Sequence, residues 1–341
     1  MKKNIALLIV AVVALFALNL LTGSVHIPIG DIADILCGRE ASNPGYGYII
    51  LESRLPQVVT AMLTGASLAT CGLLLQTVFR NPLAGPSVFG IDSGASLGVA
   101  VVILLMGGSV VTALGTLSGF VAILVSAFLG AALVMAILLW ASVKVGSNVM
   151  LLIIGIMTGY LVSSAIVLLN YLATEEGVRS YMIWGMGNFS GVPLSHLGVF
   201  SCVILVCLLL SLPMAKLLNQ LLLGEQYAEG LGLNVRKFRA VMLILTGILI
   251  ATTTAYCGPI AFIGLAVPHI ARLAFRTTDH RHLLPLAMLT GAAVALLCNL
   301  VSNLPLSGSV IPLNAITPLI GAPVVIYVII NPNRSSDRDR T

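Results

Sequence analysis

Residues 56–79 read PQVVTAMLTGASLATCGLLLQTVF, a stretch without a single charged side chain. A helix that crosses a bilayer needs about 20 consecutive, mostly apolar residues, and this stretch provides them. Its apolar residues follow one another without the strict alternation that a strand of a membrane β-barrel shows. The stretch therefore predicts a transmembrane helix and, with it, an all-α membrane protein.

Similar apolar runs fill most of the chain on both sides of this stretch. Of the 341 residues, 58% are hydrophobic and 9% are charged, whereas soluble domains have about 25% charged residues. The first run follows Lys2 and Lys3, and we interpret it as a retained helix rather than a signal peptide, because no A-x-A cleavage site follows it. We predict one polytopic transmembrane domain over residues 1–341 with about ten spans, at residues 4–22, 56–79, 88–107, 112–141, 148–172, 196–214, 239–257, 260–275, 283–302 and 312–331.

The basic residues indicate how these spans are oriented. With the N-terminus inside and ten crossings, only Arg39, Arg54 and Arg179 of the 17 Lys and Arg residues fall outside. This asymmetry follows the positive-inside rule, so both termini are predicted to be cytoplasmic. The net charge of +5 is then a signal of topology. Because no basic patch with interleaved aromatic residues accompanies it, we expect no nucleic-acid partner.

Three segments between the spans are long enough to carry a function. Residues 23–55 and 173–195 are predicted to be periplasmic, and residues 215–238 are predicted to be cytoplasmic. In the cytoplasmic segment an acid follows Gly224, and the pattern predicts a short helix that ends at Gly230 or Gly232. A short helix with small residues suits a socket on a partner protein, and the alternative is a solvated connector.

Glycines recur every four residues in several of the runs. This spacing lets two helix backbones approach closely in lipid, where no hydrophobic drive acts between helices. We interpret the glycines as packing contacts within one subunit, with a dimer face or a pore lining as the alternative. They are Gly90, Gly94 and Gly98 in the third run, Gly115 and Gly119 in the fourth, and Gly155 and Gly159 in the fifth.

The chain lacks the motifs of an enzyme or a metalloprotein. It contains neither a G-x-x-x-x-G-K-[ST] phosphate loop nor an H-E-x-x-H metal motif. Gly94 to Gly98 matches the G-x-S-x-G nucleophile motif in letters, but it lies in a continuous apolar run instead of a strand-turn-helix. The six cysteines form no C-x-x-C pair. We expect no catalytic residue, no metal and no cofactor in this chain.

Acidic residues are almost absent from the predicted spans. Asp92 is the only acid near one, and we expect it in the first turn of a helix, where the positive helix end favours a carboxylate. His269 falls near the inner face and is interpreted as packed or solvated. A proton-driven transporter would place acids or histidines near the midplane of the bilayer. Their absence argues against an ATP-independent secondary transporter, which remains a remote alternative.

A series of short strings, in order along nearly the whole chain, resembles the FecCD-type permeases of iron-siderophore, haem and vitamin B12 importers. The strings are Arg54 to Pro56, Gly65 to Ala69, Gln76, Asn81 to Pro86, Gly90, Ser93 to Ala95, Trp184 to Gly187, Gly224 and Glu225 with Ala228, Leu231 and Gly232, Gly258 to Leu265, Pro268 and His269, Asp279 to Arg281, and Gly321 to Pro323.

The resemblance implies an ABC importer permease in the inner membrane that works by alternating access. It implies a homodimer with two separate ATPase subunits inside and a periplasmic or lipid-anchored substrate-binding protein outside. Iron-siderophore import ranks first as the task, with haem or vitamin B12 (cobalamin) as alternatives.

The resemblance also implies roles for individual residues. ATPase coupling falls on Gly224, Glu225, Ala228, Gly230, Leu231 and Gly232. Docking of the binding protein falls on Arg54 and on Asn303, where the family usually has a second arginine. The cytoplasmic gate and the pathway fall on Asn81, Pro82, Leu83, Ala84, Lys144, Ser147, Asn148, Met157, Thr158 and Tyr160, and the inward face of the fifth span is left open.

Overall fold

A computed structural model describes residues 2–23, 25–107, 110–112, 115–117, 119–145, 148–304 and 311–330. Each predicted span coincides with a helix rich in apolar residues. These helices are α1 (Lys2–Leu21), α4 (Leu55–Val78), α5 (Ile91–Ala100), α6 (Gly119–Lys144), α7 (Asn148–Leu172), α9 (Leu194–Ser211), α12 (Val235–Cys257), α13 (Ile263–Phe275), α14 (His280–Ser302) and α15 (Leu313–Ile330). Seven helices in the described ranges are long and apolar enough to cross a membrane, whereas the apolar helices that contain α5, α13 and α15 are shorter. Ten crossings and the orientation of the termini stay predictions.

Shorter elements connect these helices. They are α2 (Ile29–Leu36), α3 (Pro44–Tyr48), α8 (Glu175–Gly185), α10 (Ala215–Leu222), α11 (Glu225–Gly230), the 3-10 helices Pro86–Phe89 and Leu212–Met214, and the π-helical turns Ile49–Arg54 and Val101–Leu105. The helix predicted after Gly224 is thus present as α11. Asp92 lies in the first turn of α5, as expected.

The predicted span at residues 112–141 was wrong at its start. Residues Val110–Thr112 form β1 and Gly115–Leu117 form β2, two antiparallel strands in which Val111 lies opposite Thr116. The helix begins only at Gly119. Val, Thr and Gly are weak helix formers, which is the physical reason for the later start. Gly115 therefore lies in a strand and is not a helix-packing glycine.

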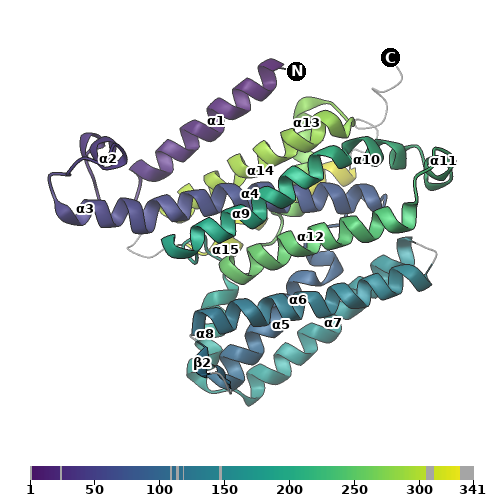
Figure 1. Cartoon of the computed structure of the whole chain (residues 1–341), viewed down its shortest axis with the longest axis horizontal. Helices are drawn as coiled ribbons and strands as arrows, with labels where there is room; N and C mark the ends of the chain where they lie inside the picture. Colours follow the sequence, from purple (N-terminus) through teal and green to yellow (C-terminus); the bar gives the residue numbers. More distant parts are fainter. Residues whose placement is uncertain are drawn as a thin grey trace.

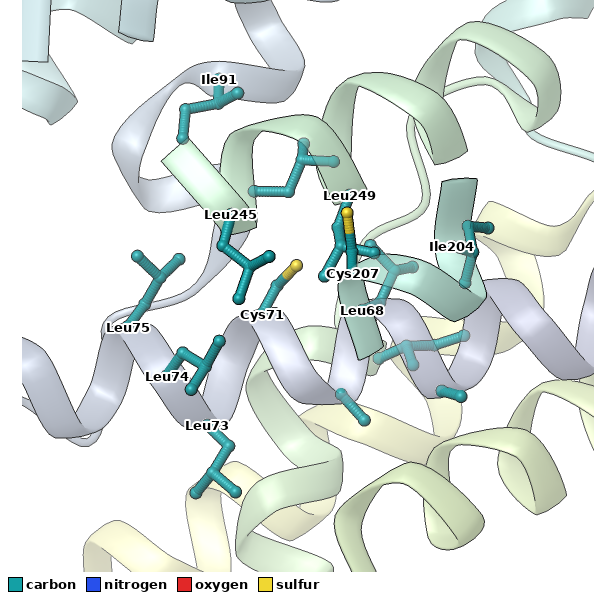
Figure 2. Close-up of a cluster of buried hydrophobic side chains, with 14 of the residues drawn as sticks. Leu68, Cys71, Leu73, Leu74, Leu75, Ile91, Ile204, Cys207, Leu245 and Leu249 are labelled. Carbon is teal, nitrogen blue, oxygen red and sulfur yellow. The ribbon is translucent and has the colours of Figure 1, made fainter. Parts of the chain in front are cut away.

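Helix α4 is the centre of the bundle, and α9, α12, α13 and α14 pack around it (Figure 1). Cys71, Leu73, Leu74 and Leu75 of α4 are completely buried. Figure 2 shows how side chains of α4 meet Ile204 and Cys207 from α9 and Leu245 and Leu249 from α12. A helix that is apolar on every side is stable only when other helices or lipid cover it, and here other helices do.

Glycines set the distance between the central helices. A Cβ atom on Gly65 of α4 would lie 2.2 Å from the backbone oxygen of Gly291 in α14. Similarly, a Cβ on Gly98 of α5 would lie 1.9 Å from the backbone oxygen of Ser126 in α6. Both contacts join helices of one chain, so the packing interpretation of the small-residue spacing is confirmed for Gly94 and Gly98, whose neighbours are in α6.

Helices α5, α6 and α7 form a second group beside the bundle around α4, and α12 lies between the two groups (Figure 1). We call the contact of α12 with α6 the α12–α6 seam. Unlike the glycine contacts above, it is filled by a flexible side chain: a Cβ on Gly247 would lie 1.9 Å from the terminal methyl of Met135.

The two ends of the molecule carry different short elements. Helices α2 and α3 lie at one end, with α8 towards the same side, and α10 and α11 lie at the other (Figure 1). We refer to them as the α3 end and the α11 end. By the predicted orientation, the α3 end is periplasmic and the α11 end is cytoplasmic.

Candidate functional site

The loop at the α11 end is held in a defined shape. Gly224 has φ +115°, a conformation open to glycine but not to other residues, and it separates α10 from α11. Arg239 of α12, with its side chain only 8% exposed, donates from Nη2 to Glu225 Oε1 at 3.0 Å. Asn234 Oδ1 accepts from the backbone N–H of Lys237 and caps α12. The start of α11 is therefore fixed to α12, and the loop ends at a capped helix.

The predicted coupling residues differ in their exposure. Gly230, Leu231 and Gly232 are exposed, and Glu225 is half-buried. Ala228 is fully buried, so it packs α11 against the bundle and offers no surface to another protein. Its predicted contact with an ATPase therefore has no support in the geometry of this chain.

Two exposed side chains on this loop were not among the predicted coupling residues. Leu223 is 65% exposed and Tyr227 is 58% exposed, and Leu231 follows at the same spacing of four with 53% exposure. We call these three residues the α11 patch. Their equal spacing carries no helical signal, because Gly224 separates Leu223 at the end of α10 from Tyr227 in α11. Their exposure therefore could not be predicted from the sequence.

The predicted gate turn at residues 81–84 is a compact reverse turn. Asn81 Oδ1 accepts from the backbone N–H of Leu83 at 2.9 Å, and Ala84 N–H donates to the Asn81 carbonyl at 3.1 Å. His269 Nε2 of α13 donates to the Pro82 carbonyl at 2.8 Å. His269 is thus a buried, packed residue, as interpreted. Ala84 is buried and Leu83 is 42% exposed.

The other predicted gate residues lie around the start of α7. Lys144 is exposed at the end of α6, and Asn148 is the first residue of α7. Ser147 lies outside the described residues. Helix α7 packs closely against the segment that follows the gate turn. A Cβ atom on Gly155 would lie only 3.2 Å from the Cα of Phe89.

The predicted pathway residues on α7 point in different directions. Met157 and Tyr160 are 53% and 66% exposed, and they share one face at a spacing of three. Thr158 donates from Oγ1 to the Ile154 carbonyl at 2.8 Å, so its hydroxyl is bonded within its own helix. The exposed face of α7 that a pathway or a second subunit could meet is therefore that of Met157 and Tyr160.

At the α3 end, Arg54 is 94% shielded from solvent, with 6% of its surface exposed. Its guanidinium donates to the carbonyl of Leu20 at 2.7 Å and to those of Leu21 and Val25. Gly23 leaves the space for this group, because a Cβ there would lie 2.7 Å from Arg54 Nη2. The docking role of Arg54 stays a prediction, and the geometry gives the side chain a competing structural role.

Asn303 belongs to a polar cluster at the same end. Gln57 Nε2 donates to Asn299 Oδ1 at 3.1 Å, and Asn303 Oδ1 lies 3.5 Å from the same Gln57 nitrogen. Asn299 in turn donates to Asn19 Oδ1 of α1 at 2.9 Å. The structure thus brings Asn303 and Arg54 to one end of α4, with Asn303 the more exposed of the two.

A cavity of about 710 Å³ opens between the end of α7 and α8. Its lining mixes apolar side chains with one acid, one base and one amide: Asn170, Ala173, Glu175, Val178, Arg179, Met182, Ile183 and Met186. We call it the α7–α8 groove. Ligand sites commonly have volumes of about 300–1,000 Å³ and a few polar groups among apolar ones, so the groove has the size and lining for a small organic ligand.

Asn314 at the start of α15 fixes the end of α8 beside this groove. Its Nδ2 donates to the carbonyls of Gly185 at 3.1 Å and Pro259 at 2.7 Å, and its Oδ1 accepts from Ala261 N–H at 3.1 Å. One side chain therefore joins α8, the loop between α12 and α13, and α15. Sequence reasoning missed it because these segments are far apart in the chain.

The bundle of long apolar helices is that of an integral membrane protein, and the family match defines its class as a transport permease. Residues 9–331 match the FecCD transport family, and the chain belongs to this family of ABC importer permeases. As a permease it is not an enzyme.

Relatives and solved structures agree with this assignment. The chain is 35% identical to the hemin transport system permease HmuU of Yersinia pestis over 294 residues, 85% of each chain. It is 35% identical to the vitamin B12 import system permease BtuC of Klebsiella pneumoniae over 281 residues, 82% of each chain. A metal-chelate type ABC transporter in an inward-facing conformation matches with TM-score 0.84 and 30% identity, covering 97% of this chain and 100% of that one. PsaBC from Streptococcus pneumoniae, at 18% identity and TM-score 0.55, shares the fold.

Proposed function

We propose that this chain is the translocation subunit of an inner-membrane importer for an organic metal chelate, working as a homodimer with two separate ATPase subunits. The α11 patch carries the proposal. Leu223, Tyr227 and Leu231 are exposed apolar side chains on a loop outside the apolar spans. Exposed apolar residues on a rigid, water-facing loop are typical of a protein-protein contact. An ATPase subunit that docks there would push directly on α11.

The mechanism is alternating access. Closure of the ATPase pair around ATP moves α11 and the helices fixed to it, and the permease changes from one open side to the other. ATP can drive this change only because it binds one arrangement of the ATPase pair more tightly than the other. The chain's own part is to convert the movement of α11 into movement of the gate turn and of α7.

The proposed dimer places the exposed face of α7 next to its counterpart in a second copy. Met157 and Tyr160 would then face the axis between the two subunits, where the pathway would run. The α7–α8 groove would open onto the outer end of this pathway. A substrate-binding protein would dock at the α3 end, where Asn303 is accessible.

The proposed substrate is a metal held in an organic chelator, with a ferric siderophore ranked first. Support for this class comes from the hemin and vitamin B12 permeases among the relatives and from the metal-chelate type transporter among the structures. The groove volume of about 710 Å³ suits a ligand of this size. Haem and cobalamin are the alternatives that the experiment must separate.

Reconstitution tests the proposal. The chain is placed in liposomes with its ATPase and binding protein, and ATP-dependent uptake of a ferric siderophore, haem and cobalamin is measured in parallel. We expect uptake of one of them, with no uptake when the ATPase is left out. Substrate movement without the ATPase would contradict the proposal and favour a secondary transporter.

A second measurement isolates the α11 patch. Tyr227→Ala should weaken binding of the purified ATPase to the permease by about tenfold or more, because aromatic anchors dominate such contacts. Tyr48→Ala is the matched control, because Tyr48 is 72% exposed but lies at the α3 end. Equal binding by both variants would show that the ATPase docks elsewhere.

A further inference from the structure

A row of side-chain hydrogen bonds runs through the α11 end from α10 towards the gate turn. It begins at Asn219 of α10, whose Oδ1 accepts from the backbone N–H and from Nδ1 of His280, both at 2.9 Å. Asn219 Nδ2 donates to Asp279 Oδ1 at 2.5 Å. One amide therefore holds the first turn of α14 through three bonds.

The row continues from α14 into α4. His280 Nε2 lies 2.8 Å from Thr77 Oγ1 in the last turn of α4, so the buried imidazole is bonded on both of its nitrogens. The preceding residue of α4, Gln76, makes the next hydrogen bonds, to α13. Its Oε1 accepts from Arg272 Nη1 at 2.7 Å, and its Nε2 donates to the Leu265 carbonyl at 3.1 Å.

The row ends on the gate turn. Arg272 and Leu265 lie on α13, and so does His269, which donates to the Pro82 carbonyl at 2.8 Å. Hydrogen bonds between segments far apart in the sequence thus connect α10, which leads into α11, with the turn at residues 81–84. Between these bonds the connection follows the helix backbone, from Thr77 to Gln76 in α4 and from Arg272 to His269 in α13. We call this row the polar strut and define it by Asn219, His280, Thr77, Gln76, Arg272 and His269.

We propose that the polar strut transmits the movement of the α11 loop to the gate turn, with Asn219 and Gln76 as its main positioning residues. This inference rests on the proposed function, because it assumes that an ATPase moves α11. Apolar helix contacts allow small sliding movements, but a buried polar group that loses its partner is strongly disfavoured. Elements joined by a row of such bonds therefore move together.

Packing alone is the competing explanation for the row. Buried polar groups need partners wherever they occur, and a network that only satisfies them would stabilise the α11 end without coupling it to anything. The two explanations differ in how far the effect spreads. Packing alone would confine the effect of a change at Asn219 to its partners at the start of α14, whereas a strut carries it to residues 81–84, which Asn219 does not contact through any hydrogen bond among the described residues. The last link is short, because the Asn81 N–H donates to the Gln76 carbonyl at 3.1 Å.

Hydrogen exchange tests this difference without any transport assay. Asn219→Leu keeps the approximate size of the side chain and removes all three bonds of the amide. In the purified chain we expect the backbone N–H groups of Leu83 and Ala84 to exchange about tenfold faster, the effect of losing roughly one buried hydrogen bond. Thr290→Val is the matched control, because the Thr290 hydroxyl is buried and, among the described residues, bonds only to Leu286 of its own helix.

Transport supplies the second readout. With ATPase and binding protein present, Asn219→Leu and Gln76→Leu should each lower the substrate imported per ATP hydrolysed by about fivefold or more while leaving ATPase binding unchanged, and the double variant should be little worse than either one, because residues of one network act non-additively. Thr290→Val should keep the wild-type ratio.

The outcomes separate the strut from the proposed function. Unchanged exchange at residues 81–84 in both strut variants would overturn the strut, and so would faster exchange with an unchanged import-to-ATP ratio. If the wild-type chain imports none of the three chelates with ATP, the proposed function fails, and the exchange result still decides whether α10 and the gate turn are connected.

Discussion

Single residues decide how closely the helices of this permease approach one another. Gly65 and Gly291 allow α4 and α14 to meet backbone to backbone, and Gly94 and Gly98 do the same for α5 and α6. Polar residues fix the ends of helices to neighbouring segments through hydrogen bonds. Arg54 is the clearest case, because its guanidinium donates to two backbone carbonyls at the end of α1 and to one just after it.

Gly65→Ala should destabilise the protein by about 1–3 kcal/mol, the usual cost of overpacking a core. The added Cβ would meet the rigid backbone oxygen of Gly291 at 2.2 Å, and neither helix can move away without disturbing its other neighbours. Thermal unfolding in detergent measures the change. Gly30→Ala in α2 is the control, because nothing lies within 4 Å of its Cβ position. Equal melting temperatures for the two variants would contradict the close approach.

Arg54→Leu should destabilise the chain by about 1–3 kcal/mol even in the absence of any binding protein, because it leaves buried carbonyls without donors. The control is Arg39→Leu, which removes an exposed ion pair with Asp34 and should cost at most about 1 kcal/mol. Unfolding of the isolated chain distinguishes the two roles of Arg54. If Arg54→Leu melts like the wild type but binds the substrate-binding protein more weakly, Arg54 acts in docking rather than in stability.

At the scale of elements, short helices at the ends of the bundle carry the proposed contacts, and each is fixed by a few polar bonds. Helix α11 is held by the Glu225–Arg239 ion pair. Helix α8 is capped at its start by Thr174, whose Oγ1 accepts from Gly177 N–H, and its end is held by Asn314. Such elements can be released singly, because few apolar contacts would have to break with them.

Asn314→Leu should release the end of α8. The variant loses three hydrogen bonds that join α8, the loop after α12 and α15, so we expect exchange of the amides in residues 182–188 to rise about tenfold or more. Uptake should fall, since the α7–α8 groove loses a fixed wall. Ser164→Ala is the control, because in the described part of the chain the Ser164 hydroxyl bonds only to Tyr160 within α7. Unchanged exchange in α8 would show that apolar contacts alone hold it.

At the scale of the whole molecule, the predicted topology determines from which side of the membrane a residue can be labelled. Cys37 is exposed and lies in the segment predicted to be periplasmic, whereas Gln226 is exposed on the α11 loop. In a chain whose only cysteine is Cys37, a membrane-impermeant maleimide should label intact spheroplasts. With Gln226→Cys as the only cysteine, labelling should require disrupted membranes. Labelling of both from one side would show that the number of spans between them is wrong.

Much of the fold could be predicted from the sequence, because an unbroken apolar run in lipid has few alternatives to a helix. The start of α6 could not, since the weak helix formers at residues 110–117 were hidden inside an apolar run. The α11 loop and its helix were readable from Gly224 and the acid after it. The burial of Ala228 and Arg54, and the bonds of Asn219 and Asn314, depend on segments that meet only in three dimensions.

The methionine at the α12–α6 seam gives the molecule a soft joint between two stiff halves. Met135 presents an unbranched, rotatable tail to the flat surface of Gly247, while glycine contacts hold the helices inside each half. The helices around α4 and the group α5 to α7 can therefore shift slightly against each other while each group keeps its internal packing.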